Sequence, residues 1–140
     1  MIRAFTADDM NTVINLWLAA SIDAHDFVEP DYWHSKIDTV RNDYLPVSST
    51  WVYCEDDEVK GFYSLLENKL AALFVDPKHQ QNGIGSELLQ HAIAQQDDLH
   101  LTVYAQNFDA VRLYKKHGFT IQGEQVNMYT GHPEFIMTRA

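Results

Sequence analysis

Three runs of β-branched and aromatic residues follow one another closely in the middle of the chain. They cover Thr50–Cys54, Val59–Leu66 and Leu70–Val75, with polar connections of four and three residues between them. Runs of this composition are typical of strands, and connections this short join antiparallel neighbours. The sequence therefore predicts a three-stranded antiparallel meander at the centre of the fold.

Apolar residues at helical spacing flank this meander on both sides and alternate with further strands. Before the meander, the expected elements are a strand over Ile2–Phe5, a helix capped by Thr6, and a second helix over Tyr32–Leu45 that Pro46 ends. After it, they are a helix from about Ser86, a strand over Leu99–Ala105, a helix over Phe108–His117 that stops at Gly118, and strands over Phe119–Gln122 and Glu134–Thr138. This order predicts a single α+β domain over residues 1–140, with helices on both faces of a mixed, strongly twisted sheet.

Charge argues against a nucleic-acid partner and is divided unevenly along the chain. Twenty acidic and ten basic residues give a formal net charge of −10, the wrong sign for binding a phosphate backbone. Up to Glu67 there are thirteen acids and four bases, a net of −9, and the remainder has seven acids and six bases, a net of −1. The acidic half would attract a cationic ligand, although a solvating acidic surface explains the same asymmetry.

Cysteine usage and hydropathy indicate where the protein works. Cys54 is the single cysteine, so no internal disulfide is possible, and metal-binding patterns such as Cys-x-x-Cys or His-Glu-x-x-His do not occur. The N-terminus has no apolar signal-peptide run, and no stretch approaches the ~20 apolar residues of a membrane span. We expect a cytoplasmic protein with no metal and no membrane partner.

A glycine-containing loop, Gln80-Gln81-Asn82-Gly83-Ile84-Gly85-Ser86, joins the third strand of the meander to the next helix. Backbone N–H groups in such a loop can converge on an anion, and the first turn of the helix adds further donors. The loop is not a dinucleotide fingerprint, because Leu88 stands where a third glycine is needed, and it lacks the Gly-Lys-Ser/Thr of a P-loop. A plain strand-to-helix turn is the other interpretation.

A second motif, Asn107-x-x-Ala110-x-x-Leu113-Tyr114-x-x-x-Gly118-Phe119, follows a predicted strand. Together with Gln80-x-x-Gly83-x-Gly85 it resembles the two signature regions of the GNAT superfamily, the Gcn5-related N-acetyltransferases. The predicted order of elements matches this family from end to end, and the N-terminal half resembles a small bacterial subgroup, the YiaC/YjaB-like acetyltransferases. Gln81 departs from the glycine or arginine of many members, which bears on cofactor affinity more than on function.

The resemblance implies acetyl-CoA as donor and a primary amine that attacks its thioester directly through a tetrahedral intermediate. The glycine loop and the start of the Ser86 helix would hold the pyrophosphate, and an exposed strand edge would pair with the pantetheine arm. An ordinary buried strand would have the same sequence, and Asn107 equally suits a helix N-cap. The implied cofactor-binding residues are Leu73, Phe74, Val75, Gln80, Gln81, Asn82, Gly83, Ile84, Gly85, Ser86, Asn107 and Tyr114.

Tyr114 matches the family tyrosine that protonates the departing thiolate, and its reference pKa of ~10 is not far above the ~8.5 of a thiol. The amine must lose a proton, for which Glu67 and His25 are the candidates, directly or through water. The residues expected to line the acceptor cleft are His25, Phe27, Tyr32 and Trp33. Each residue also has a structural interpretation: Tyr114 as a core tyrosine, Glu67 as an exposed turn glutamate, and His25 as a surface or capping histidine. The three aromatic residues can equally be core residues.

The acceptor and the oligomeric state stay open at this level. A small amine, a protein lysine and an N-terminal amine all fit the family and the acidic first half of the chain, and so do a monomer and a homodimer. The competing interpretation is a catalytically silent module that binds CoA as a sensor or interaction partner.

Overall fold

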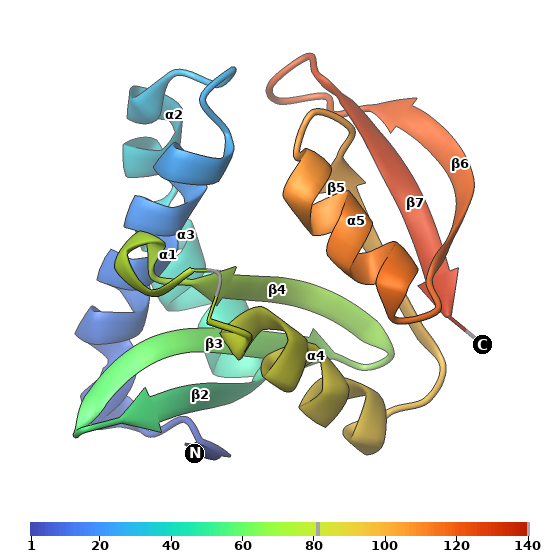
Figure 1. Cartoon of the computed structure of the whole chain (residues 1–140). Helices are drawn as coiled ribbons and strands as arrows, with labels where there is room; N and C mark the ends of the chain where they lie inside the picture. Colours follow the sequence, from blue (N-terminus) through green and yellow to red (C-terminus); the bar gives the residue numbers. More distant parts are fainter. Residues whose placement is uncertain (81, 140) are drawn as a thin grey trace.

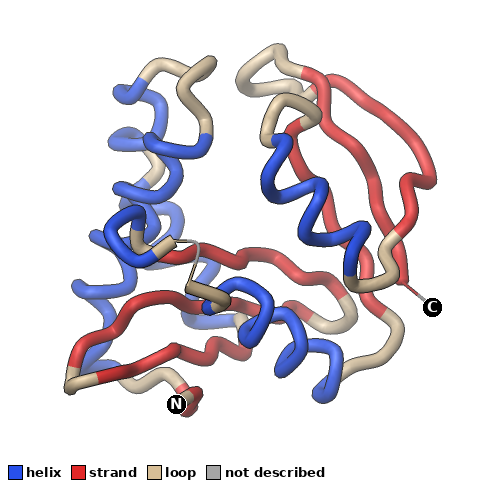
Figure 2. Tube along the Cα trace, viewed as in Figure 1, coloured by secondary structure: helices blue, strands red, loops and turns tan. Residues whose placement is uncertain are grey.

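A computed structural model describes residues 1–80 and 82–139, which form a mixed sheet of seven strands in the order β1-β2-β3-β4-β5-β7-β6 (Figures 1 and 2). The strands are β1 (Ile2–Ala4), β2 (Ser49–Glu55), β3 (Glu58–Leu66), β4 (Lys69–Val75), β5 (Leu99–Tyr104), β6 (Thr120–Val126) and β7 (Pro133–Arg139). All neighbours pair antiparallel except β4 and β5, which are parallel.

The predicted meander is confirmed as β2, β3 and β4, paired in sequence order. The turn between β2 and β3 places Asp56 and Asp57 at φ values of 56° and 62°, the left-handed conformation that a tight hairpin requires. Glu67, between β3 and β4, adopts φ 55°. These short turns fix the register of the meander, and the other elements of the fold pack on it.

Helices cover both faces of the sheet, as predicted. The helices α1 (Met10–Ala24), α2 (Pro30–Ser35) and α3 (Ile37–Thr39) lie on one face, and α4 (Ile84–Gln95) and α5 (Phe108–Lys116) on the other (Figure 1). Strand alternation explains the two cores: Phe62 packs toward α1, whereas its neighbour Tyr63 packs toward α4 and α5. Within residues 1–80 and 82–139, every helix is too short or too polar to cross a lipid bilayer.

Some boundaries differ from the prediction. α4 begins at Ile84 rather than Ser86, and β6 extends to Val126. The predicted helix over residues 32–45 is divided into α2, α3, the π-helical turn η2 (Val40–Tyr44) and the 3₁₀ turn η3 (Leu45–Val47). Pro46 lies inside η3 because the first turn of a helix needs no N–H from it.

Two further short turns connect strands to helices. The 3₁₀ turn η1 (Ala7–Asp9) begins after Thr6, as predicted, and leads into α1. The Asp9 carboxylate accepts hydrogen bonds from the Thr6 N–H at 2.8 Å and from both terminal nitrogens of Arg3 at 2.8 and 2.9 Å. These bonds, chiefly those of Arg3, lower the pKa of Asp9 to about 2. The second turn, η4 (Pro77–His79), follows β4.

The sheet opens between β4 and β5. The two strands pair at Lys69 and His100 and then diverge, so that β5, β6 and β7 form an arm separate from β1 to β4 (Figure 2). Among the described strands, residues 70–75 of β4 pair only with β3. One edge of β4 is therefore open to a ligand that pairs with backbone groups.

Candidate active site

The loop after β4 ends at a helix N-terminus that no side chain of residues 1–80 or 82–139 caps. Gly83 is the N-cap residue of α4 and adopts φ +81°, which glycine reaches without strain at Cβ. The Glu87 N–H donates to the Gly83 carbonyl at 3.0 Å, and the N–H groups of residues 84–86 precede this first helical bond. Such a turn has free donors and a partial positive charge, the properties of an anion site.

Side chains of this loop are arranged so that the backbone faces outward. Ile84 is buried in the core beneath α4, Gly85 and Ser86 are half-buried, and Asn82 is exposed. Gln81, the predicted departure from the family pattern, lies outside the described residues. Since Ile84 contributes only its N–H, the anion site depends on backbone geometry more than on side-chain chemistry.

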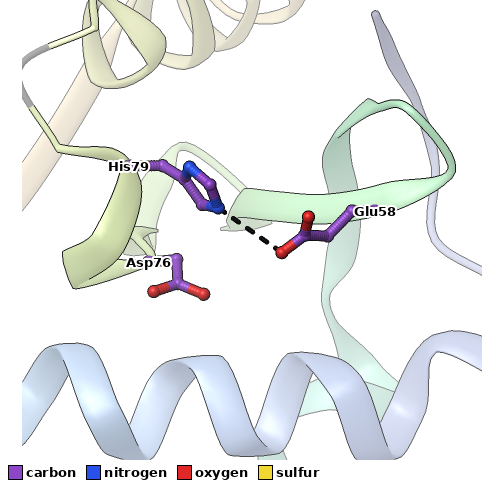
Figure 3. A group of neighbouring side chains, drawn as sticks. All are labelled: Glu58, Asp76 and His79. Carbon is purple, nitrogen blue, oxygen red and sulfur yellow. Dashed lines mark hydrogen bonds and ion pairs between the residues drawn. The ribbon is translucent and has the colours of Figure 1, made fainter.

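Contacts on both sides hold the loop in place. The Gln80 side-chain amide donates to the Val75 carbonyl at 3.3 Å, and Ser86 Oγ lies 3.3 Å from His117 Nε2 at the end of α5. On the turn before the loop, His79 Nε2 lies 3.4 Å from a carboxylate oxygen of Glu58 (Figure 3). The anion site is thus tied to β4, α5 and the β2–β3 hairpin.

Glu58, Asp76 and His79 also form a group whose donor atoms lie within 4.8 Å of one another, close enough to hold a metal ion (Figure 3). One Asp76 oxygen accepts the Lys78 N–H at 3.0 Å, as an N-cap of η4. With that bond and the contact between Glu58 and His79, polar interactions within the protein account for the arrangement of all three side chains.

The predicted strand edge lies in β4 beside the opening of the sheet. Leu73 and Val75 point toward α4 and α5, Phe74 points toward α1, and all three are half-buried. The Val75 carbonyl is engaged by Gln80, so the open part of the edge begins before it. This position suits pairing with a ligand that carries amides, next to the anion site.

Tyr114 lies on the buried face of α5 and packs against Phe119, with 5.6 Å between the ring centroids. It is 7% exposed, and burial raises the pKa of its phenol well above the usual value. The phenol is therefore fully protonated at neutral pH, as a proton donor must be. The structure thus confirms Tyr114 as a core residue, and its role as the acid stays a prediction.

His25 and Asn107 meet although 82 positions separate them in the chain. Asn107 is the N-cap of α5, since its side-chain oxygen Oδ1 accepts a hydrogen bond from the Ala110 N–H at 3.4 Å. Its NH₂ group therefore faces His25 and donates to Nε2 at 3.3 Å. This places the imidazole proton on Nδ1, which is fully buried and has no hydrogen-bond partner among the described residues.

Burial, only partly offset by the nearby Ser21 carbonyl, lowers the pKa of His25 to about 4. The ring lies 5.0 Å from both the Trp33 and the Tyr104 rings. His25 is thus a neutral residue held in an aromatic cluster, and its acceptor nitrogen is already occupied. This arrangement favours a positioning role over that of a free base.

The predicted acceptor aromatics lie where the α1–α2 loop meets the arm formed by β5, β6 and β7. Phe27 contacts Tyr104 at 5.4 Å and His132 at 5.0 Å between ring centroids, so the α1–α2 loop reaches the β6–β7 loop. Trp33 is buried beneath this contact, and Tyr32 is half-buried beside it. The four predicted residues are brought together, with Trp33 serving mainly as core.

Glu67 is not brought to this cluster. Its turn is exposed and lies at the closed end of the opening, beside the pairing of Lys69 with His100. The aromatic cluster contacts Tyr104, four residues further along β5 than His100, which is about 13 Å along a strand. A direct role for this carboxylate at the His25–Asn107 contact is therefore disfavoured.

Sequence reasoning missed Tyr104, Tyr129, His132 and Glu134, which also surround this cluster. Tyr104 and Glu134 are direct partners across β5 and β7, and Thr130 donates to the Tyr104 hydroxyl at 3.3 Å. The sequence gives no sign of these pairings, because they depend on strand register. Only the aromatic content of residues 127–132, in a connection between strands, hints at a binding loop.

Comparison with known proteins gives relatives over nearly the whole chain. A family described as "Acetyltransferase (GNAT) domain" matches residues 46–121. Identity is 35% to the peptidyl-lysine N-acetyltransferase YiaC and 36% to the peptidyl-lysine N-acetyltransferase YjaB, both of Escherichia coli strain K12. Each alignment covers 99% of this chain and 95% of the relative.

Solved structures agree with these matches. The solution structure of apo YjaB from Escherichia coli has a TM-score of 0.85 at 30% identity, over 100% of this chain and 97% of that one. The PaiA N-acetyltransferase of Thermoplasma acidophilum, solved in complex with coenzyme A, has the same fold, with a TM-score of 0.82 at 21% identity over 99% and 97%. The open sheet, the uncapped helix and these matches together establish that the chain belongs to the GNAT family of acetyltransferases.

Proposed function

We propose that this protein transfers the acetyl group of acetyl-CoA to the side-chain amine of lysine in proteins or peptides. The observation that carries the proposal is the uncapped N-terminus of α4 at the opening between β4 and β5. A ligand with a diphosphate and an amide-containing arm needs these two features side by side. The lysine acceptor is suggested by the names of both relatives that match the full chain.

Each predicted cofactor residue has a place in this proposal. Backbone donors of residues 80–86 hold the diphosphate, and the edge of β4 before the Val75 carbonyl pairs with the arm. Asn107 keeps α5 in place through its cap and its bond to His25, and its position at the end of β5 suits contact with the arm. The fit is to acetyl-CoA as a co-substrate, released as CoA after each turnover.

The proposed chemistry is direct transfer through a tetrahedral intermediate. The neutral amine nitrogen bonds to the thioester carbonyl carbon, the carbon–sulfur bond breaks, and Tyr114 gives its phenolic proton to the departing thiolate. The nitrogen loses one proton as the amide forms, and this proton returns through water to the Tyr114 phenolate. Burial raises the pKa of Tyr114 and makes the phenol a weaker acid, but a thiolate buried to the same degree becomes more basic as well, so the difference between the two pKa values is preserved.

The attacking amine must be neutral, yet a lysine with a reference pKa of ~10.4 has only about 10⁻³ of its population in that form at pH 7. His25 is poorly suited as the base, because its pKa is about 4 and Asn107 occupies its Nε2. We therefore propose that His25 positions Asn107. Glu67 would have to accept the proton through a chain of several waters, because its turn lies about 13 Å along β5 from the aromatic cluster.

Release of CoA thiol from acetyl-CoA tests the proposal, with three acceptors compared under equal conditions. These are a lysine peptide with a blocked N-terminus, a lysine-free peptide with a free N-terminus, and a small diamine. We expect the lysine peptide to react fastest. The assay is run under reducing conditions, because we propose that the enzyme is cytoplasmic. Coenzyme A binding without turnover on any of the three would favour the silent binding module instead.

Replacing Gly83 with Val should weaken coenzyme A binding about tenfold or more. Nothing lies within 4 Å of the added Cβ, so the effect arises from the backbone and not from crowding. A left-handed conformation costs a non-glycine residue about 1–2 kcal/mol, and a β-branched one resists it most, so the loop would rearrange. Titration calorimetry with coenzyme A measures the change.

Gly131→Val is the matched control for this experiment. Gly131 lies in the β6–β7 loop, has φ +76°, and also has nothing within 4 Å of an added Cβ. It should suffer the same backbone strain and keep the wild-type affinity for coenzyme A. Equal affinities in both variants would remove the loop from the cofactor site.

A further inference from the structure

Glu134, the second residue of β7, carries a buried carboxylate with neutral partners. It is 8% exposed and accepts hydrogen bonds from the side-chain amides of Gln125 at 2.7 Å and Asn127 at 3.3 Å. It takes part in none of the ion pairs found in residues 1–80 and 82–139. The carboxylate thus has amide partners and no cation in the described part of the chain, and a cationic ligand would add a charge-assisted contact.

This carboxylate lines a pocket of about 320 Å³ on the β6–β7 loop. The other lining residues are Gln125, Val126, Asn127, Met128 and Tyr129, so Glu134 is the charged member of the wall. Val126, Met128 and Tyr129 are 66%, 83% and 70% exposed, which leaves apolar surface around a buried negative charge. An alkyl chain that ends in a cation matches both properties.

The pocket lies next to the aromatic cluster, where the α1–α2 loop contacts β5 and the β6–β7 loop. Glu134 is the cross-strand partner of Tyr104, which contacts both His25 and Phe27. The negative charge of Glu134 adds to burial in raising the pKa values of Tyr104 and Tyr32. The carboxylate therefore acts on Tyr32, which was predicted to line the acceptor cleft, and on Tyr104, which contacts two more of the predicted residues.

The protein already places one alkylammonium group against these rings. Lys36 Nζ lies 5.0 Å from the centre of the Tyr129 ring and 5.6 Å from that of Tyr32. Rings at this spacing attract a cation through their π faces. Lys36 comes from the end of α2, and it makes no ion pair with Glu134 in the described part of the chain.

We propose that Glu134 is a specificity-determining residue that binds an alkylammonium group of the acceptor. The inference rests on the proposed function for the identity of the acceptor, but it concerns binding and involves no bond made or broken. The ammonium can belong to the acceptor lysine before it loses its proton, or to a basic residue beside that lysine. The recognition chemistry is the same for both.

Three peptides labelled with a fluorophore test the proposal by anisotropy in the presence of coenzyme A. One has a single lysine among neutral residues, the second adds an arginine next to that lysine, and the third replaces the lysine with norleucine. Each is titrated with the wild-type protein, with Glu134→Gln, and with Glu124→Gln as control. Glu124 is an exposed acid on β6 and loses the same charge outside the pocket.

We expect the wild-type protein and Glu124→Gln to bind the lysine peptide about tenfold or more tightly than the norleucine peptide, the scale of one charge-assisted contact. Glu134→Gln should lose most of this preference. If Glu134→Gln weakens binding of the arginine-containing peptide alone, the bound cation is the flanking one. Melting temperature and coenzyme A affinity check that each variant is folded.

If the wild-type protein binds neither the lysine peptide nor the arginine-containing peptide more tightly than the norleucine peptide, the inference is overturned, and this result needs no variant. So would an unchanged preference in Glu134→Gln. Failure of the proposed function is distinguishable, because the lysine preference would then be present in binding while no acetylated peptide appears by mass spectrometry.

Discussion

Tyr114→Phe should lower turnover about 10²- to 10⁴-fold while the affinity for coenzyme A stays close to that of the wild-type protein. The substitution removes the proton donor, and a general acid contributes a factor of this size. The ring and its contact with Phe119 remain, so α5 keeps its packing in the core. Steady-state thiol release gives turnover, and calorimetry gives the affinity.

Tyr63→Phe is the matched control, since Tyr63 is also a buried tyrosine. Its hydroxyl bonds to His91 Nδ1 at 2.6 Å, on the face of α4 and away from Asn107. Its loss should reduce the free energy of unfolding by about 1 kcal/mol and leave turnover nearly unchanged. Wild-type turnover in Tyr114→Phe would exclude the phenol as the acid.

Acidification from pH 6.5 to pH 4 should lower the free energy of unfolding by about 3 kcal/mol through His25 alone. The pKa of His25 falls from 6.5 to about 4 on folding, because burial disfavours the charged ring. The unfolded chain therefore binds a proton more readily than the folded protein in this range. The contribution to stability is fully present above pH 6.5 and is lost as the pH falls through the folded pKa.

The difference between wild-type and His25→Gln unfolding curves, measured in urea at several pH values, isolates this contribution. Glutamine can still accept the Asn107 hydrogen bond, so the variant keeps a partner for that amide. His34→Gln, at an exposed position of α2, should reproduce the wild-type pH dependence. Parallel curves for wild type and His25→Gln would show that the ring is not held neutral by burial.

Local pattern was sufficient for most of the elements. Runs of β-branched and aromatic residues with short polar turns predicted β2, β3 and β4. Gly118, at φ +94°, follows the end of α5 as predicted. The helix over residues 32–45 was the main exception. Its apolar spacing is helical throughout, but Lys36 adopts φ −98° and ψ −1° between α2 and α3, a break that periodicity alone does not reveal.

The parts of the candidate site also differ in how far local sequence predicted them. The anion site is local, because a glycine before an amphipathic helix needs only its own backbone to present N–H groups. The general acid depends less on local sequence. Helical spacing predicted that Tyr114 lies on a buried face, and only the family resemblance gave it a role. The base could not be derived, since protonation depends on burial and partners that come from distant segments.

What the sequence alone determined is the order of the elements, the turn chemistry and the family, because each depends on residues a few positions apart. Tertiary structure decided that His25 is neutral and bonded to Asn107, that Glu67 lies apart from them, and that Glu134 faces a pocket beside Tyr104. The reason is that strand register and the divergence of β4 from β5 set these distances, and both follow from packing of the whole sheet rather than from any single segment.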